Sequence, residues 1–318
     1  MIRPLRKKLW ILFLFGMSIL SFGQQATSKQ NTVSIVILGT VQDAGSPHIG
    51  CEKECCASLF ISPDPTRKVV SLGLIDTENK KTYLFEATPD ITEQVKTLKQ
   101  YASWDANELP NGIFLTHAHI GHYTGLMYLG KEAINAKAIR TYAMPKMKGF
   151  LETNGPWSQL VSNENIVLYP LENQKEILLA PNLKVIPFTV PHRDEFSETV
   201  GYRIIGPNKS ALFIPDIDKW EKWETNITAE ITKVDYAFID ATFYDGEELN
   251  TRDISQIPHP FVSESMALFQ RLTKEEKQKI YFIHFNHTNP LLDPKSEQAS
   301  HVLANGFNIA RFGDRISL

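Results

Sequence analysis

Three histidines lie within six residues of one another, in the stretch 116–122 (THAHIGH). An apolar run precedes this stretch, so the sequence predicts a strand, a turn and the start of a helix. On an extended segment the side chains of His117 and His119 point the same way, and His122 returns from the first helical turn. Such a cluster binds borderline-soft divalent metals, zinc first, and suits two ions better than one. The alternative is three surface or packing histidines, but random sequence rarely places three of nine so close.

The composition favours a soluble globular protein. The chain has 318 residues, a formal net charge of −3 and 42% hydrophobic residues, which suffices for one large or two small domains with a filled core. Lysine and arginine are scattered, so nothing indicates nucleic acid as a partner. We expect a small-molecule substrate.

The first residues are typical of a secretory signal peptide. Basic residues at 3–8 precede an apolar run at 9–20, and small residues at 21–23 offer an exit before Gln24. The run is short for a membrane span, although an uncleaved anchor is the alternative. We therefore expect a signal peptide at 1–23, a linker at 24–32 and one domain at 33–318. The protein would be periplasmic or secreted, without membrane contact after cleavage.

Export bears on the three cysteines, Cys51, Cys55 and Cys56. An oxidising compartment favours disulfides, but an odd number leaves one cysteine over. A disulfide from Cys51 to Cys55 or Cys56 is one interpretation. We favour the other, in which the thiolates bind a metal ion.

Short apolar runs and helical patterns alternate along the rest of the chain. The predicted strands are 33–38, 69–75, 81–86, 113–115, 138–142, 166–169, 183–190, 199–205, 211–214, 236–239 and 280–285. The predicted helices are 90–101 (capped by Asp90), 125–129, 219–233 and 262–272, and the stretch 144–155 is predicted as a helix and loop. Two successive sets of strands followed by helices predict an α/β fold. It is an αββα sandwich with two mixed sheets packed face to face and helices outside.

The pattern Thr-His-x-His-x-x-His after a strand resembles the signature of the metallo-β-lactamase superfamily of hydrolases. This resemblance implies the same αββα sandwich. The usual signature has an aspartate just before the last histidine, where this chain has Gly121. Because an anionic ligand is missing there, we expect the second metal site to be much weaker than the first.

Three later residues match superfamily ligands by their order and their places at strand ends. The resemblance implies that His192 belongs to the first metal site, that His284 belongs to the second, and that Asp216 bridges both. A bound metal lowers the pKa of its water toward about 7, which makes hydroxide available for hydrolysis. The implied metal ligands are His117, His119, His122, His192, Asp216 and His284.

Stretches 38–56, 192–195 and 284–290 are similar to two families within the superfamily. One is the pyrroloquinoline-quinone biosynthesis protein B family, and the other is the cyclic-ribose phosphate phosphodiesterases of phosphonate breakdown. In the latter, first-loop cysteines and a histidine three residues after the last catalytic histidine hold a structural zinc. The spacing differs here, since two cysteines are adjacent and position 53 is lysine. The implied structural site is Cys51, Cys55, Cys56 and His287.

Other polar residues are candidates for supporting roles. A histidine of related phosphodiesterases implies that His259 donates to the substrate; the alternative is a solvated turn histidine. Asp43 and His48, in the first loop, are candidates for the carboxylate or base missing from the signature. Asp240 either accepts a hydrogen bond behind a ligand or merely ends a strand. His301 is expected on the surface.

The sequence thus predicts an exported metal-dependent hydrolase, foremost a phosphodiesterase using a metal-bound hydroxide. Its expected catalytic residues are Asp216, His259 and Asp43. We expect one or two zinc ions in the active site and one structural zinc, with manganese or iron as alternatives. Other hypotheses are a lactonase or β-lactam hydrolase, a quinone-cofactor biosynthesis enzyme, and a non-catalytic metal or cofactor carrier. If Asp43 completes the second site, Asp43→Ala should empty that site and Gly121→Asp should strengthen it.

Overall fold

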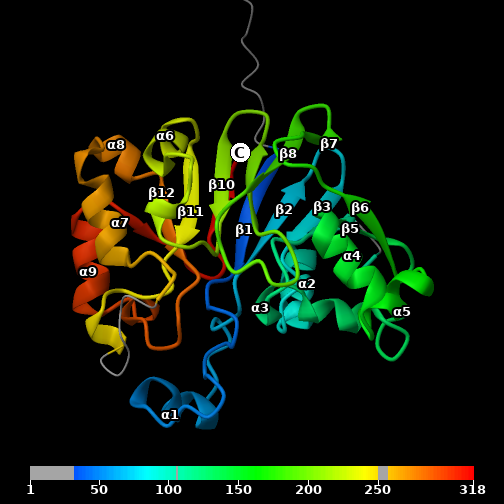
Figure 1. Cartoon of the computed structure of the whole chain (residues 1–318), viewed down its shortest axis with the longest axis horizontal. Helices are drawn as coiled ribbons and strands as arrows, with labels where there is room; N and C mark the ends of the chain where they lie inside the picture. Colours follow the sequence, from blue (N-terminus) through cyan, green and yellow to red (C-terminus); the bar gives the residue numbers. More distant parts are fainter. Residues whose placement is uncertain (1–31, 105–106, 250–256) are drawn as a thin grey trace, which may run out of the picture. The chain divides into compact units, whose positions relative to one another are not determined.

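Two seven-stranded sheets organise the computed structural model, which describes residues 32–104, 107–249 and 257–318 (Figure 1). The first sheet has the order β14-β1-β2-β3-β4-β5-β6 and the second β13-β12-β11-β10-β9-β8-β7. The first comprises β1 (Val33–Gly39), β2 (Ser71–Asp76), β3 (Lys81–Phe85), β4 (Gly112–Phe114), β5 (Ile139–Ala143), β6 (Ile166–Pro170) and β14 (Arg315–Ser317). The second comprises β7 (Ile177–Ala180), β8 (Leu183–Thr189), β9 (Val200–Ile205), β10 (Ser210–Ile214), β11 (Tyr236–Asp240), β12 (Ile280–Ile283) and β13 (Asn308–Ile309).

Helices cover the outer face of each sheet. Beside the first sheet lie α2 (Ile91–Gln100), α3 (Ile120–Tyr123), α4 (Pro145–Thr153) and α5 (Trp157–Ser162). Beside the second lie α6 (Ile227–Thr232), α7 (Val262–Leu268), α8 (Lys274–Lys277) and α9 (Glu297–Ala304). The remaining helix, α1 (Glu54–Ile61), lies apart from both sheets in Figure 1.

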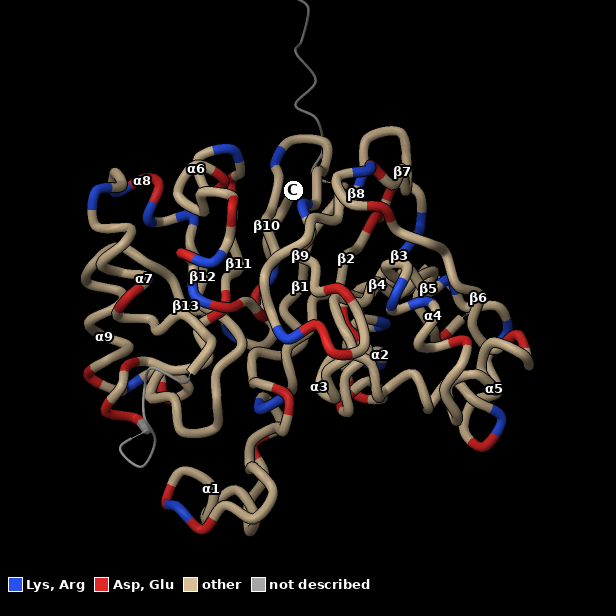
Figure 2. Tube along the Cα trace, viewed as in Figure 1, with Lys and Arg blue, Asp and Glu red and all other residues tan. Residues whose placement is uncertain are grey.

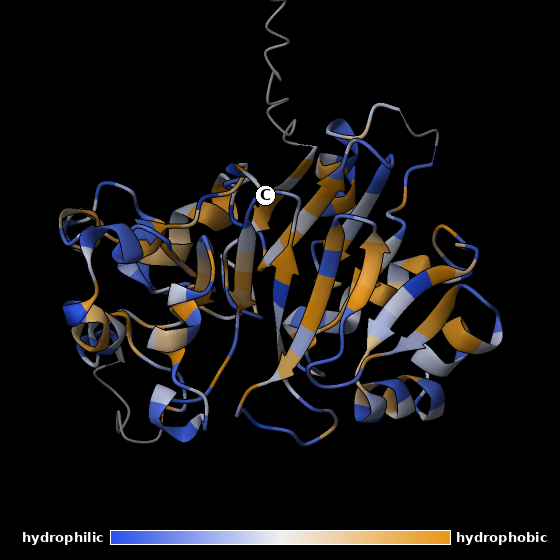
Figure 3. Cartoon of the chain, turned by 90° about the horizontal axis from the view of Figure 1, so that it is seen from above, coloured by the Kyte–Doolittle hydropathy of each residue, from blue (hydrophilic) through white to orange (hydrophobic). Residues whose placement is uncertain are grey.

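The alternation of side chains along β1 shows how the layers form. Val33, Ile35 and Ile37 belong to the apolar core between the sheets, whereas Val36 and Leu38 belong to the core beneath α2, α4 and α5. A period of two requires this division. A third core joins the second sheet to α6, α7 and α9, and Figure 3 shows hydrophobic residues concentrated in the strands. The predicted αββα fold class is confirmed.

The backbone that follows β1 connects the two sheets at the edge where the strands carrying the site residues end. Parallel pairing of β3 to β6, and of β10 to β13, sends several carboxyl ends to the same side of each sheet. Val41 forms isolated bridges to Val69, just before β2, and to Phe285, just after β12. The loop after β1 is therefore fixed between the two sheets, where ligand sites form in such folds.

The predicted strands agree with the observed ones to within two residues at each end. The sequence analysis missed β7, β13, β14, α1, α5, α8 and α9. The predicted helix 219–233 is wrong, because it is divided into a 3-10 turn (Trp220–Lys222) and α6. Asn226 separates the two by accepting a hydrogen bond from the Ala229 amide (3.1 Å), which starts a new helix.

Asp90 stands at the N-cap position of α2 but does not cap it with its side chain. Its Oδ2 atom instead accepts a hydrogen bond from the backbone N–H of Val69, at 2.7 Å. The predicted side-chain cap is therefore wrong, and Asp90 fixes the segment that leads into β2.

The described residues, from Thr32 onward, form one compact unit. The predicted signal peptide, and the linker as far as residue 31, lie outside the described residues. Within the described ranges, no helix is both long and apolar enough to cross a membrane. Positive and negative residues are interspersed along the trace, as the scattered charges of the sequence predicted (Figure 2).

Candidate metal centres

The sequence-predicted ligands come together from strand ends and short loops of both sheets. His117 and His119 follow β4, and His122 lies in α3. From the second sheet, His192 follows β8 and Asp216 follows β10. His284, after β12, completes the set.

The first group of donor atoms consists of His117, His119, His192 and Asp216, within 4.8 Å of one another. Asp216 Oδ2 lies 3.3 Å from His117 Nε2 and 3.1 Å from His192 Nε2. His119 Nδ1 lies 2.8 Å from His117 Nε2 and 3.2 Å from His192 Nε2. Three imidazoles and one carboxylate therefore converge on one point.

A second group consists of Asp43, His122, Asp216 and His284. Asp43 Oδ1 lies 2.8 Å from His122 Nε2 and 3.7 Å from His284 Nε2. Asp216 Oδ2 is 3.9 Å from His122 Nε2, so this carboxylate belongs to both groups. Asp43, proposed as catalytic from the sequence, is thus placed among the candidate metal ligands.

Buried atoms without partners indicate that these donor sets fit metal ions. Asp43 Oδ1, His122 Nε2 and His284 Nε2 are buried and face one another, with Asp43 Oδ1 2.8 Å and 3.7 Å from the two nitrogens, but none of the three makes a hydrogen bond of good geometry within the described part of the chain. Burying such an atom unsatisfied costs about 1–3 kcal/mol. Nitrogen and carboxylate oxygen are the donors that zinc, manganese and iron accept, and a shared ion would satisfy all three atoms.

The other ring nitrogen of each ligand histidine faces an oxygen. Thr116 Oγ1 lies 2.9 Å from His117 Nδ1, and Thr242 Oγ1 lies 2.9 Å from His284 Nδ1. The corresponding oxygens for the remaining rings are Glu86 Oε1 for His122 (3.4 Å), Asp218 Oδ1 for His192 (3.3 Å) and Glu195 Oε2 for His119 (3.5 Å). Such partners fix the tautomer and orientation of a metal-binding imidazole. The sequence analysis did not predict these oxygens as partners. Thr116 is adjacent to a ligand in the chain, but the others are not adjacent to the histidines they contact.

The charges in the cluster keep its two carboxylates ionised. Burial alone would raise the pKa of Asp216, but His192, His259 and a hydrogen bond from His117 outweigh burial and hold this pKa well below its usual value. For Asp43, His122 and His284 likewise outweigh burial and lower the pKa. Both carboxylates are therefore anionic at neutral pH, as metal ligands must be.

His259 lies beside the cluster, as expected from the sequence. Its Nδ1 atom is 3.1 Å from Asp216 Oδ1 and 2.9 Å from Asp240 Oδ2. Asp240 is fully buried and also accepts from the backbone N–H groups of Ile217 and Thr242. Asp240 is the last residue of β11, as one of its two interpretations expected, and its carboxylate also faces His259 at 2.9 Å and the ligand histidine His284 at 3.8 Å.

Two strand ends at the site have unusual backbone conformations. Glu86, after β3, has φ 77°, and His284, after β12, has φ 69°. Non-glycine residues rarely adopt this left-handed region, and those that do are common at functional sites. The conformation turns both side chains toward the cluster, where Glu86 faces His122 and His284 faces Asp43.

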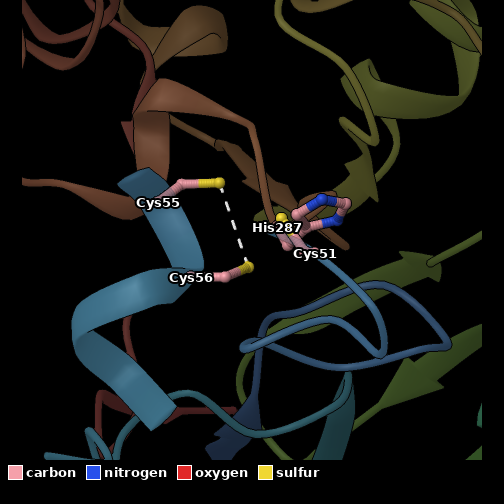
Figure 4. A group of neighbouring side chains, drawn as sticks. All are labelled: Cys51, Cys55, Cys56 and His287. Atoms are coloured by element: carbon pink, nitrogen blue, oxygen red, sulfur yellow. Dashed lines mark hydrogen bonds between the residues drawn. The ribbon is translucent and has the colours of Figure 1, made fainter. Parts of the chain in front are cut away.

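The three cysteines and His287 form a separate group with donor atoms within 4.8 Å of one another. The sulfurs of Cys55 and Cys56 point from α1 toward Cys51 and His287 (Figure 4). All three thiols are free, and the Cys55 and Cys56 sulfurs are 3.9 Å apart. The disulfide interpretation is not supported, and four soft donors in one place fit a closed zinc site.

His287 is prepared to act as a neutral ligand in this group. Burial, with the nearby charges of His48 and Lys53, lowers the pKa of His287 to about 4. The His48 ring lies against the His287 ring, with centroids 4.4 Å apart. His48 therefore lies beside the cysteine group and belongs to none of the histidine donor groups, so the expectation that it supplies a base to the histidine cluster is wrong. His301 is exposed on α9, as predicted.

An αββα sandwich whose strand ends gather histidines and aspartates defines the metallo-β-lactamase class of proteins. The sequence pattern of the Beta-lactamase superfamily domain matches residues 81–285, more than half of the chain. The chain therefore belongs to the beta-lactamase superfamily, which confirms the resemblance drawn from the histidine signature.

Curated relatives and solved structures match nearly the whole chain. Coenzyme PQQ synthesis protein B of Methylorubrum extorquens (strain PA1) is 22% identical over 309 residues, covering 89% of this chain and 99% of that protein. The same protein of Xanthomonas euvesicatoria pv. vesicatoria (strain 85-10) is 23% identical over 313 residues with equal coverage.

Among solved structures, Zn²⁺-bound PqqB from Methylobacterium extorquens has a TM-score of 0.74 and 22% identity, covering 90% of this chain and 100% of that one. A new diphosphatase from the PhnP family has a TM-score of 0.63 and 21% identity, covering 90% and 97%. These likenesses confirm the fold.

Proposed function

We propose that the protein is a metal-dependent hydrolase, foremost a phosphodiesterase. The observation that carries this proposal is the pair of donor groups sharing Asp216. These groups would hold two ions that share Asp216, and such a pair would supply the charge stabilisation for a displacement in which one oxygen attacks and another leaves. Superfamily membership and the likeness in fold to a diphosphatase support the proposal. The proposed metal is zinc, with manganese or iron as alternatives, held by His117, His119, His122, His192, Asp216 and His284.

When bound, the metal would polarise a substrate oxygen and lower the pKa of its water. The exposure of the chain's own residues indicates the direction from which a substrate approaches the histidine cluster. The side chains of His119 and His259 each keep 13% exposure, whereas those of His117 and His122 are 1% exposed or less. The substrate therefore reaches the cluster from the side of His119 and His259. Asp216 and Asp240 hold His259 Nδ1, which leaves Nε2 to face the substrate.

A panel of three substrates tests the proposed function. Metal-free protein is reconstituted with zinc, manganese or iron and assayed with bis-p-nitrophenyl phosphate, a lactone and nitrocefin. We expect hydrolysis of the phosphodiester. Turnover of the lactone or nitrocefin alone would assign the protein to one of the other hydrolase hypotheses. No turnover of any substrate with any metal would contradict the hydrolase proposal and favour a metal or cofactor carrier.

One observation supports a second candidate function, in quinone-cofactor biosynthesis. The match to coenzyme PQQ synthesis protein B extends over 99% of that protein and not over the shared superfamily domain alone. This candidate predicts that iron-loaded protein converts a quinone precursor while leaving the phosphodiester intact. Phosphodiester hydrolysis by the zinc form would speak against it.

Replacing His259 by alanine should slow phosphodiester hydrolysis without releasing metal. We expect kcat to fall about a hundredfold, the lower end of what a single positioned donor contributes. Metal content, measured by mass spectrometry of the digested protein, should stay at the wild-type value because the six proposed ligands remain. His301→Ala, on the exposed face of α9, is the matched control. Wild-type kcat in His259→Ala would exclude a donor role.

We also propose that the protein is exported and cleaved after residue 23. The support is the basic start, the apolar run at 9–20 and the small residues at 21–23. Protein purified from its native host should have an N-terminus near Gln24 by mass spectrometry. A mature protein that retains Met1 would contradict cleavage and favour the uncleaved anchor.

A further inference from the structure

Gly121 has no room for a side chain. A Cβ atom placed on it would lie 2.4 Å from Asp43 Cα and 2.6 Å from Asp43 Oδ1. Separations under about 3 Å do not occur between non-bonded carbons at this position, so the first loop would have to move. Asp43 therefore occupies the space into which a residue at 121 would extend.

Asp43 also places its carboxylate where a ligand is needed. Its Oδ1 atom faces His122 Nε2 at 2.8 Å and His284 Nε2 at 3.7 Å, and it is buried without a hydrogen bond in the described residues. The only other carboxylate of this donor group is Asp216, which the first group shares. A second anion is needed to offset the charge of a second divalent ion.

The backbone around Asp43 holds it in this position. The amide of Gln42 donates to the Phe285 carbonyl at 2.8 Å, and the amide of Phe285 donates to the Thr40 carbonyl at 2.7 Å. These bonds fasten the loop directly beside His284. Gly45 closes a turn with Gln42 (2.9 Å) and has φ +78°, a conformation that glycine adopts without strain. These backbone hydrogen bonds thus fix the position of the Asp43 carboxylate in the protein without a bound ion.

From these observations we infer that Asp43 is a metal ligand that completes the second site with His122, Asp216 and His284. The carboxylate that the superfamily signature carries on α3 is supplied here from the loop after β1, and Gly121 is the residue that makes room for it. We therefore no longer expect Gly121→Asp to strengthen the second site, because the new side chain would displace Asp43. This inference rests on the metal-dependent function proposed above and specifies its second site.

Metal binding to three variants tests the inference without an activity assay. Asp43→Asn keeps the size of the side chain and removes its charge. Gly121→Ala adds the clashing Cβ and leaves Asp43 in the sequence. Gly149→Ala is the control, since a Cβ at Gly149 in α4 meets nothing within 4 Å. Zinc per chain is counted, and affinities are measured by competition with a chromophoric chelator, after thermal unfolding confirms that each variant is folded.

We expect wild type and Gly149→Ala to hold two ions in the histidine cluster. In Asp43→Asn and Gly121→Ala, one of the two should bind at least about tenfold more weakly, since even the loss of an outer partner of a metal ligand costs 10–100-fold. Unchanged affinities for both ions in both variants would overturn the inference.

If a variant does not fold, anomalous diffraction from zinc-loaded wild-type protein tests whether Asp43 binds an ion. An ion bound by Asp43, His122 and His284 is expected, and an Asp43 carboxylate that contacts no ion would overturn the inference. Because these readouts do not need turnover, they separate the inference from the proposed function. An inactive protein that binds an ion through Asp43 would contradict only the function.

Discussion

Replacing His117 or His192 by alanine is expected to lower kcat/KM for a phosphodiester by at least about a thousandfold, since a catalytic metal contributes several kcal/mol and each 1.36 kcal/mol is tenfold. Each of these residues contributes one of the three imidazoles of the first donor group, and Asp216 lies within 3.3 Å of both. Removing either leaves two imidazoles and a carboxylate that the second group also uses. The first ion should then be lost or bound much more weakly.

The fold should survive either substitution. Three apolar cores hold the four layers together, and neither histidine belongs to them. Circular dichroism and thermal unfolding should therefore resemble those of wild type, while zinc content falls by at least one ion per chain. Near wild-type turnover in His117→Ala or His192→Ala would exclude that residue as a ligand.

Loss of the cysteine site is expected to release α1 and the loop that leads to it. Of the eight residues of α1, Cys56 alone is buried, and a helix this short is not stable by itself in water. A structural zinc contributes on the order of 10 kcal/mol to small zinc-dependent folds, so the proposed ion would provide most of the local stability here. Cys51→Ser should therefore increase trypsin cleavage after the exposed Lys53 by at least about a thousandfold at equal protease.

Cys51 is the suitable position for this test because its side chain is partly exposed, so serine changes the packing little. Ser58→Ala, on the exposed side of α1, is the control and should be cleaved like wild type. The variant should also carry one zinc fewer per chain while keeping the ions of the histidine cluster. Wild-type zinc content and wild-type cleavage of Cys51→Ser would contradict a structural metal site.

The parts of the site that lie close together in the chain could be predicted from the sequence. The spacing of His117, His119 and His122 within one turn determines where their rings point, and the structure brings all three together. His192 and His284 are far apart in the chain, and only the order of superfamily ligands indicated their roles. The αββα sandwich could be predicted from the order of strands and helices along the chain, because the periodicity of apolar residues indicates most of these elements.

What the sequence did not reveal depends on contacts between distant segments. Glu86 faces His122 and Thr242 faces His284 from the end of the neighbouring strand in the same sheet, and no local pattern marks these two residues. The close approach of Asp43 to Gly121 likewise appears only once β1 and β4 are paired through β2 and β3. Short edge strands such as β13, with two residues, carry too few residues for a periodic signal.

The most direct test of the central claim is a metal titration of the metal-free protein followed by hydrolysis of bis-p-nitrophenyl phosphate. Zinc, manganese or iron is added in steps, and bound ions and initial rate are measured on the same samples. We predict that the rate stays near background while the cysteine site fills and then rises as the histidine cluster fills. It should reach a plateau when the cluster holds two ions. A protein whose histidine cluster is fully occupied by each metal in turn, and which still does not hydrolyse the phosphodiester, would contradict the proposed phosphodiesterase function.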